Sequence, residues 1–355
     1  MKANTNFKKF LIRRGWGGLL IFLLFSCTEE NYITLPQPNK GLVNVYIEGN
    51  ITNAEAQAKL DAEIGTITEN IYVQNTTQLT EVIIKPVSNI RDIKVFNNNA
   101  LKSLLIQGNG NKMNDLIIGY EADYLPNGHK LNNIIVNGIV EANKFFIGFS
   151  AYNNTPNEIV NIECNDLTTL NSKLHIRTNS SQINRIKFND LKYINKIFKS
   201  NDNDTNNNYA TFLSGVEIKM PELEEVDKCY IGIPQYFTLP KLKKAKNLGL
   251  TYYLQPNEQE INLPLLNEVK ILVINTASSS PFTLVMPNLT ICDEAYFYKN
   301  LPSTNVNNIL HQLLTLQQTS SKTIYLNAPM NQPPTGQGLI DKQTLINKGY
   351  NVLTN

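Results

Sequence analysis

The sequence has few of the residues on which most catalytic and metal sites depend. It contains three histidines and four cysteines, and 17% of its 355 residues are charged, against about 25% in an average protein. His129, His175 and His311 lie far apart and fall on different expected elements. Nucleophile elbows, zinc-spaced Cys/His pairs, phosphate-binding loops and dinucleotide fingerprints are absent. We therefore expect no catalytic residue, no metal ligand and no cofactor, and thus no enzyme.

The charges that are present nearly cancel. The net charge is +2, and much of the basic excess lies within the first 26 residues. This balance lacks the electrostatic footprint of a nucleic-acid-binding protein, so we expect no nucleic-acid partner. Asparagine is abundant in place of charged residues. Because asparagine tolerates left-handed backbone and can stack in rows, its abundance predicts many tight turns.

A long apolar run is also missing, but a short one stands near the start. Residues 18–25 are mostly apolar, follow the basic residues of the first 14 positions, and end at Ser26-Cys27. A run of this length behind a basic flank is typical of a secretory signal, since a spanning helix needs about 20 apolar residues. We assign residues 1–26 to the signal peptide.

The residues Leu24-Phe25-Ser26-Cys27 resemble a bacterial lipobox, although Phe25 is bulkier than the residue usual there. The resemblance implies that Cys27 carries a diacylglycerol, and a lipid anchor of several acyl chains would hold the protein to a membrane. An ordinary signal peptide with an incidental cysteine is the alternative.

Behind the cysteine, Glu29 and Glu30 resemble the surface-export signal of Bacteroidota-type lipoproteins. That resemblance implies attachment to the outer membrane with the protein exposed at the cell surface; a solvated tether is the alternative. With Pro36 and Pro38, residues 27–40 form an acidic, proline-containing tether.

A repeated frame organises the second half of the chain. It reads apolar-Pro-x-Leu-x-x-small/apolar-x-x-apolar-x-apolar, and its leucines are Leu223, Leu242, Leu266 and Leu289. Pro-x-Leu favours one turn of helix or 3₁₀, and the final alternation favours a short strand with one buried face. A period of about 20–29 residues with one strand per coil is leucine-rich-repeat geometry. The copies occupy residues 220–231, 239–250, 263–274 and 286–297.

The cysteines fit the same frame. Cys164, Cys229 and Cys292 occupy positions that are apolar in the other copies. An odd number beyond Cys27 could instead mean one disulfide and a free thiol. Because free cysteine behaves as a small apolar residue, we expect all three in the core.

Upstream, short apolar segments recur every ten to twenty residues between 70 and 160. They suit narrower coils of the same solenoid, with a parallel β-helix as the competing interpretation. We therefore expect an α/β solenoid, a leucine-rich-repeat-type array with one short parallel strand per coil and helical caps at both ends. The expected parts are an N-terminal cap at 41–69 with a strand and then a helix starting at an Asn53 cap, the array at 70–304, and a C-terminal cap at 305–355 with helices near 306–316 and 339–347.

These residues together resemble the leucine-rich-repeat surface lipoproteins of Bacteroidota, including BspA-like proteins, and residues 333–350 look like their terminal cap. The resemblance implies surface display and adhesion or binding of a protein or glycan ligand, and it supplies no catalytic residues. We expect a binding surface on the outward face of the strands. Its candidate residues are Tyr230, Tyr253, Tyr296 and Tyr298, although ordinary strand propensity also explains tyrosine there.

Two alternatives remain open. One is a carbohydrate-active enzyme on a parallel β-helix, which would need carboxylates or Lys/Arg clustered on adjacent coils. The other is a purely structural surface component.

Overall fold

The computed structural model describes most of the chain after residue 39, and residues 39–355 form one compact unit. The expected signal peptide, Cys27 and nearly all of the tether lie outside the described residues. So do Tyr253 and His129. The described ranges are 40–119, 130–148, 160–177, 183–194, 217–233, 236–252, 259–276, 282–298, 300–318 and 322–355.

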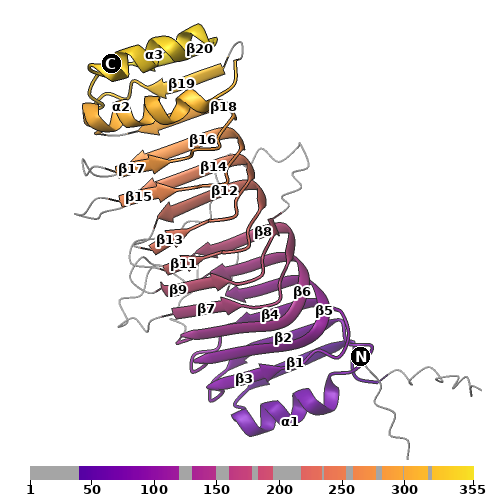
Figure 1. Cartoon of the computed structure of the whole chain (residues 1–355). Coiled ribbons are helices and arrows are strands. Elements are labelled where there is room, and N and C mark those ends of the chain that lie inside the picture. The colour runs from indigo at the N-terminus through magenta and orange to yellow at the C-terminus, as the bar shows by residue number, and fades with distance from the viewer. Residues whose placement is uncertain are drawn as a thin grey trace, which may run out of the picture. The chain divides into compact units, whose positions relative to one another are not determined.

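The described part is mostly a large parallel β-sheet with few helices, which is consistent with a solenoid or β-helix-like repeat (Figure 1). The chain repeatedly adds strands to two parallel ladders. The first ladder consists of β1 (Asn44–Gly49), β2 (Asn70–Thr76), β4 (Ile90–Phe96), the later parts of β5 (Ser103–Gly119) and β6 (Asn133–Gly148), β8 (Thr169–Arg177), β10 (Tyr193–Ile194), β12 (Glu225–Ile233), β14 (Lys244–Tyr252), β16 (Glu268–Thr276), β18 (Ile291–Tyr298), β19 (Lys322–Leu326) and β20 (Tyr350–Thr354).

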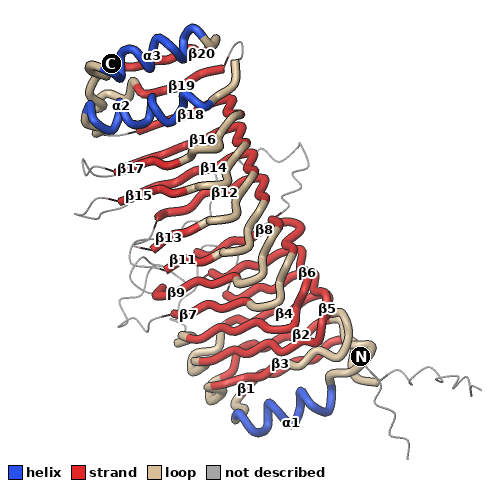
Figure 2. The backbone as a smooth tube through the Cα atoms, in the orientation of Figure 1, coloured by secondary structure: helices blue, strands red, loops and turns tan. Residues whose placement is uncertain are grey.

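The second ladder takes the other strand of each turn (Figure 2). It consists of β3 (Glu81–Ile84), the early parts of β5 and β6, β7 (Val160–Cys164), β9 (Ile183–Phe188), β11 (Glu217–Lys219) and β13 (Tyr236–Thr238). In the next two turns, β15 (Gln259–Asn262) and β17 (Phe282–Val285) pair with each other as a separate sheet.

The prediction of one strand per coil is wrong wherever a turn of the chain contains two strands, one in the first ladder and one outside it. In the repeat frame, the residue three positions before proline is also apolar and buried, as at Ile218, Ile261 and Leu284. That residue anchors the second strand. Upstream, segments 71–73 and 93–95 lie in the first ladder, whereas 82–84 lies in the second. A spacing of about ten residues is therefore half a turn, and not a narrower coil.

The Pro-x-Leu element is a single β-turn in every copy, where we expected a turn of helix or 3₁₀. Its leucine is fully buried and donates its backbone N–H to the carbonyl three residues earlier. The bonds run from Leu223 to Met220 (3.3 Å), Leu242 to Leu239 (3.3 Å), Leu266 to Leu263 (3.2 Å) and Leu289 to Met286 (3.2 Å).

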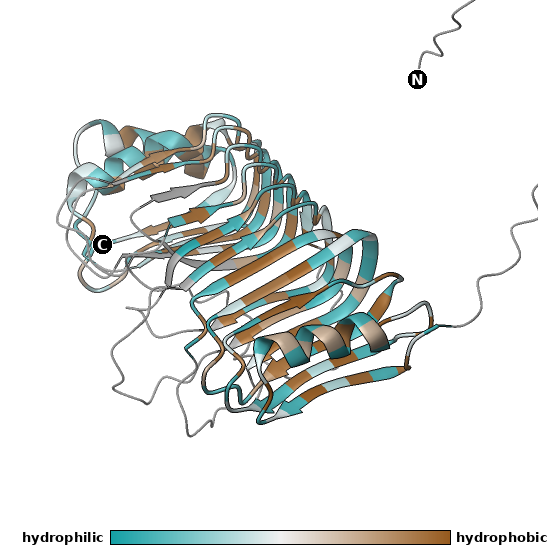
Figure 3. Cartoon of the chain, turned by 90° about the horizontal axis from the view of Figure 1, so that it is seen from below, coloured by the Kyte–Doolittle hydropathy of each residue, from teal (hydrophilic) through white to brown (hydrophobic). Residues whose placement is uncertain are grey.

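One continuous apolar core contains residues of both ladders. Along many strands, hydrophobic residues alternate with hydrophilic ones (Figure 3), as expected for strands with one buried face. Cys164, Cys229 and Cys292 are free and buried in this core, which confirms the prediction. Burial raises the pKa of the Cys229 and Cys292 thiols to about 12, so these groups are inert packing residues rather than nucleophiles.

Asparagine makes many of the turns and also links them, as expected. Asn75 and Asn97 both adopt left-handed backbone, with φ of 53° and 54°. Asn97 Nδ2 donates to Asn75 Oδ1 at 2.5 Å. Asn137 in β6 and Asn165 and Asn189, which directly follow β7 and β9, form a similar row of side-chain hydrogen bonds. These side-chain amides stabilise turns that would otherwise depend on water.

Helices occur at both ends of the described unit. Helix α1 (Asn53–Glu63) contacts β1 and β3, α2 (Ser303–Gln312) contacts β17, and α3 (Gln337–Asn347) contacts α2 and β20. The expected elements are thus present. The cap of α1, however, is Thr52 and not Asn53: Thr52 and Glu55 form a reciprocal capping box. Helix α2 begins three residues before the expected start and gives way at Leu313–Thr315 to a 3₁₀ turn.

Candidate binding surface

The outer face of the first ladder, opposite the core, is the surface on which sequence analysis placed its candidate residues. Parallel pairing aligns the same position of successive strands into rows along this face. One row runs from Tyr230 through Gly249 and Val273 to Tyr296 and then Tyr325. Tyr230 and Tyr296 therefore share a row, but two rungs without an aromatic residue separate them.

A tyrosine cluster forms at the C-terminal part of this face. The rings of Tyr296 and Tyr325 stack with centroids 4.3 Å apart and planes 5° apart. Tyr298 lies two residues along β18, with its ring 6.0 Å from that of Tyr296, and it is 41% exposed. The structure therefore joins two predicted residues to Tyr325, which was not among the predicted residues. Its alternation with the buried Ile324 was the available signal.

The stacking limits what the cluster can contact. Tyr325 covers one face of the Tyr296 ring, and the Tyr296 hydroxyl donates to Glu294 Oε2 at 2.6 Å. This hydrogen bond holds the pKa of Tyr296 well above its ordinary value. Tyr296 thus supports the neighbouring ring of Tyr298. Of the three tyrosines in the cluster, Tyr298 is the most exposed and offers the most contact area to a ligand.

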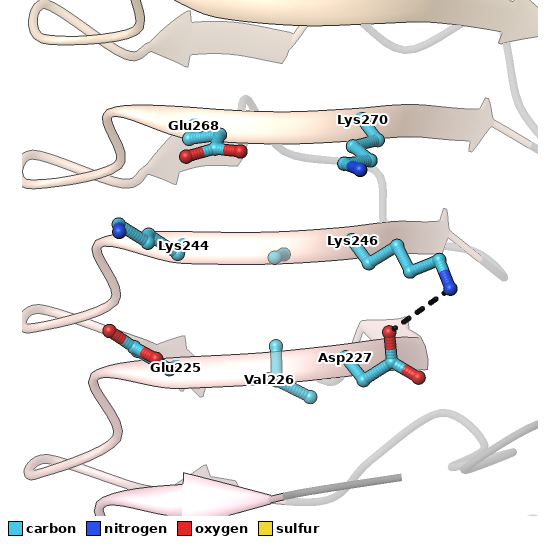
Figure 4. Close-up of a pocket in the computed structure, with 8 residues that line it drawn as sticks. Glu225, Val226, Asp227, Lys244, Lys246, Glu268 and Lys270 are labelled. Carbon is cyan, nitrogen blue, oxygen red and sulfur yellow. Dashed lines mark ion pairs between the residues drawn. The ribbon is translucent and has the colours of Figure 1, made fainter. Parts of the chain in front are cut away.

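A shallow hollow of about 200 Å³ lies on β12, β14 and β16 (Figure 4). Val226 and Ala245, both 4% exposed, lie beneath charged side chains. The charges alternate between rungs: Glu225, Lys244 and Glu268 are in register, while Asp227 pairs with Lys246 at 3.8 Å. The remaining lining residue is Lys270, for which the described residues provide no hydrogen bond or ion pair.

Alternating charges continue beside the hollow. Lys243 Nζ lies 2.7 Å from Glu224 Oε2 on the preceding turn, and Lys241 pairs in the same way with Glu222. The hydrogen bond from Lys243 lowers the pKa of the Glu224 carboxyl. These glutamates connect successive turns. Opposite charges neutralise each other here, and this part of the face carries no strong field.

The N-terminal part of the same face is organised differently. Here Asp92, Asp115, Lys144 and Lys173 occupy one register position on four consecutive rungs. Like charges stand side by side, first two carboxylates and then two ammonium groups. This row is not visible in the sequence, because its members are 23 to 29 residues apart and no short motif contains them.

An aromatic and cationic row runs parallel to that charged row. The rings of Tyr46 and Tyr72 stack at 4.8 Å, and Lys94 Nζ lies 5.9 Å from the centre of the Tyr72 ring. Lys94 also pairs with Asp92 at 3.3 Å. Further along, the rings of Phe146 and His175 are 5.0 Å apart. The N-terminal part therefore combines carboxylates, amines and aromatic rings within two adjacent rows.

The two histidines within the described residues, His175 and His311, lie on separate elements and do not form a common site. His175 lies on β8, whereas His311 lies on α2 with Nδ1 3.2 Å from Asp341 Oδ2. The His311 side chain is 65% exposed. In the part of the chain that the structure describes, no three His, Cys, Asp or Glu side chains are grouped to hold a metal ion. No helix among the described residues is long and apolar enough to cross a membrane.

Comparison with known protein families, with curated proteins and with solved structures gives no match for this chain.

Proposed function

We propose that the chain is a lipid-anchored, surface-displayed binding protein that holds its ligand on the outer face of the first ladder. Cys27 carries the anchor in the outer membrane, and the strands behind it form a solenoid of the leucine-rich-repeat surface-lipoprotein type with helical caps. The ligand is a protein or a glycan, and no reaction follows binding.

The tyrosine cluster carries this proposal. Tyr298 is 41% exposed beside the stacked pair of Tyr296 and Tyr325. Aromatic side chains of this kind supply large, rigid contact area and are enriched at binding hot spots. The stacked pair fixes the position of Tyr298, so a ligand has little conformational entropy to remove.

Replacing Tyr298 with alanine is expected to weaken ligand binding about tenfold or more, because truncating a hot-spot aromatic costs 2 kcal/mol or more. The measurement is a glycan and protein array probed with wild type and variants, followed by titration of the strongest ligand. Tyr193→Ala is the matched control, since Tyr193 is 39% exposed on another strand of the same ladder. Equal affinities for the two variants would remove the tyrosine cluster from the proposal.

A second candidate function is a carbohydrate-active enzyme. The observation that favours it is the register pairing of Asp92 with Asp115, next to Lys144, because adjacent carboxylates can divide acid and base roles. Depolymerisation of a glycan by the wild-type protein, and its loss in Asp115→Asn, would favour this function over simple binding.

A further inference from the structure

The row of Asp92, Asp115, Lys144 and Lys173 differs from the row of Glu225, Lys244 and Glu268 at the hollow. In that second row, successive strands place an acid beside a base, which is the arrangement that stabilises a stack of strands. Lys144 and Lys173 instead stand directly opposite each other. Like charges at opposite positions of a sheet are destabilising, so the fold gains nothing from this pair.

The surroundings of Lys144 further destabilise its charged form. Burial lowers its pKa, Asp115 partly offsets this effect, and Lys173 lowers the pKa further. A half-buried amine next to a second amine is stabilised when an anion binds both. Costly charge arrangements of this kind are more frequent at functional sites than elsewhere.

The backbone around the row excludes one class of ligand. Each of these strands pairs with a neighbour on both sides, from β4 to β8. An extended peptide that binds by adding a strand needs a free sheet edge, and none exists at this position. Recognition must come from side chains, which suits a ligand rich in hydroxyl groups.

We propose that this row is a subsite for an acidic glycan, whose carboxylate binds between Lys144 and Lys173. The inference rests on the proposed binding function and names its ligand class. The carboxylates of Asp92 and Asp115 accept hydrogen bonds from hydroxyls of the neighbouring sugars. Asn143 Nδ2 donates to Asp115 Oδ1 at 3.2 Å, and Lys94 pairs with Asp92, so both acceptors are held in place.

The row continues beyond the charged residues. Asn44 and Asn70 occupy the same register position on β1 and β2. Asn70 Nδ2 donates to Asn44 Oδ1 at 2.6 Å. Amide and carboxylate side chains thus occupy the four successive strands β1, β2, β4 and β5, about 4.8 Å apart. A linear polymer with repeating hydroxyl groups can contact such a row at several successive sugars.

The test is binding of the full-length chain, purified in detergent, to polygalacturonate and to the same polymer after methyl esterification. Wild type should bind the charged polymer, lose affinity steeply with added salt, and bind the ester at least tenfold more weakly. Lys144→Gln with Lys173→Gln should weaken binding to the charged polymer by about tenfold or more, because two charge-assisted hydrogen bonds are lost. Lys144→Arg with Lys173→Arg should remain within about threefold of wild type, since both charges are kept.

The matched control is Lys187→Gln with Lys219→Gln. These lysines also stand opposite each other, on β9 and β11 of the second ladder, and their loss should leave affinity unchanged. The proposal would be overturned if both glutamine double variants bound equally well, or if the control pair lost more affinity. It would also be overturned if the arginine double variant lost as much affinity as Lys144→Gln with Lys173→Gln. If the wild-type chain does not bind polygalacturonate but shows Tyr298-dependent binding on the array, the subsite is contradicted and the proposed function is not.

Discussion

Replacing Phe188 with alanine is expected to lower the free energy of unfolding by about 3–5 kcal/mol, the usual cost of truncating a buried phenylalanine. Phe188 is fully buried in β9 of the second ladder. Its ring packs edge-to-face against Phe145 in β6 of the first ladder, with centroids 6.3 Å apart and planes at 83°. The substitution therefore leaves a cavity between the two ladders, where relaxation of one strand cannot fill it.

The effect should be local as well as large, because each turn of a repeat array contacts only its neighbours. Hydrogen exchange read by mass spectrometry should show faster exchange in β6 to β9, while β18 to β20 change little. Tyr193→Ala, at an exposed position, should change stability by about 0.5 kcal/mol or less. A loss below about 1 kcal/mol for Phe188→Ala would mean that the two ladders do not pack through this ring.

Replacing Asn331 with alanine is expected to destabilise the C-terminal turns by about 3 kcal/mol or more. The side chain is 4% exposed. Its Nδ2 donates to the carbonyls of Phe297 and Leu326, both at 3.0 Å, and its Oδ1 accepts from the Leu301 amide at 3.1 Å. Each buried backbone group left without a partner costs about 1–3 kcal/mol.

Denaturant unfolding and exchange at β18 and β19 would measure this loss. Asn351→Ala is the matched control, since Asn351 lies on β20 with an exposed side chain and should be nearly neutral. Asn331→Asp keeps the acceptor but directs a buried carboxylate oxygen at the two carbonyl oxygens, so a loss at least as large as that of the alanine variant is expected. Equal stability of the Asn331 and Asn351 alanine variants would contradict the assigned hydrogen bonds.

Much of the fold could be predicted from local pattern. The frame with buried Leu223 and its equivalents places the strands and turns of the second half correctly, because alternation and proline act on neighbouring residues. In the second half, the second strand of each turn was missed, since a three-residue strand such as β11 contains one buried residue, Ile218. One apolar residue between polar ones is too little signal to distinguish a strand from a loop.

The candidate surface was predictable only in part. Tyr296 and Tyr298 stand on an outward-facing alternation that the sequence displays. The pairing of Lys144 with Lys173 depends instead on how many residues each intervening turn contains, and turns of unequal length hide the register. Side-chain rows of this kind become visible only when the strands are aligned in space.

The central claim is that ligands bind the outer face of the first ladder. Acetylation of lysines, with and without the strongest ligand found on the array, tests it most directly. Lys144 and Lys173 lie on that face, whereas Lys187 and Lys219 lie on the second ladder. Binding on the outer face predicts that bound ligand slows acetylation of Lys144 and Lys173 and leaves Lys187 and Lys219 unchanged. Protection of Lys187 and Lys219 alone would contradict the claim.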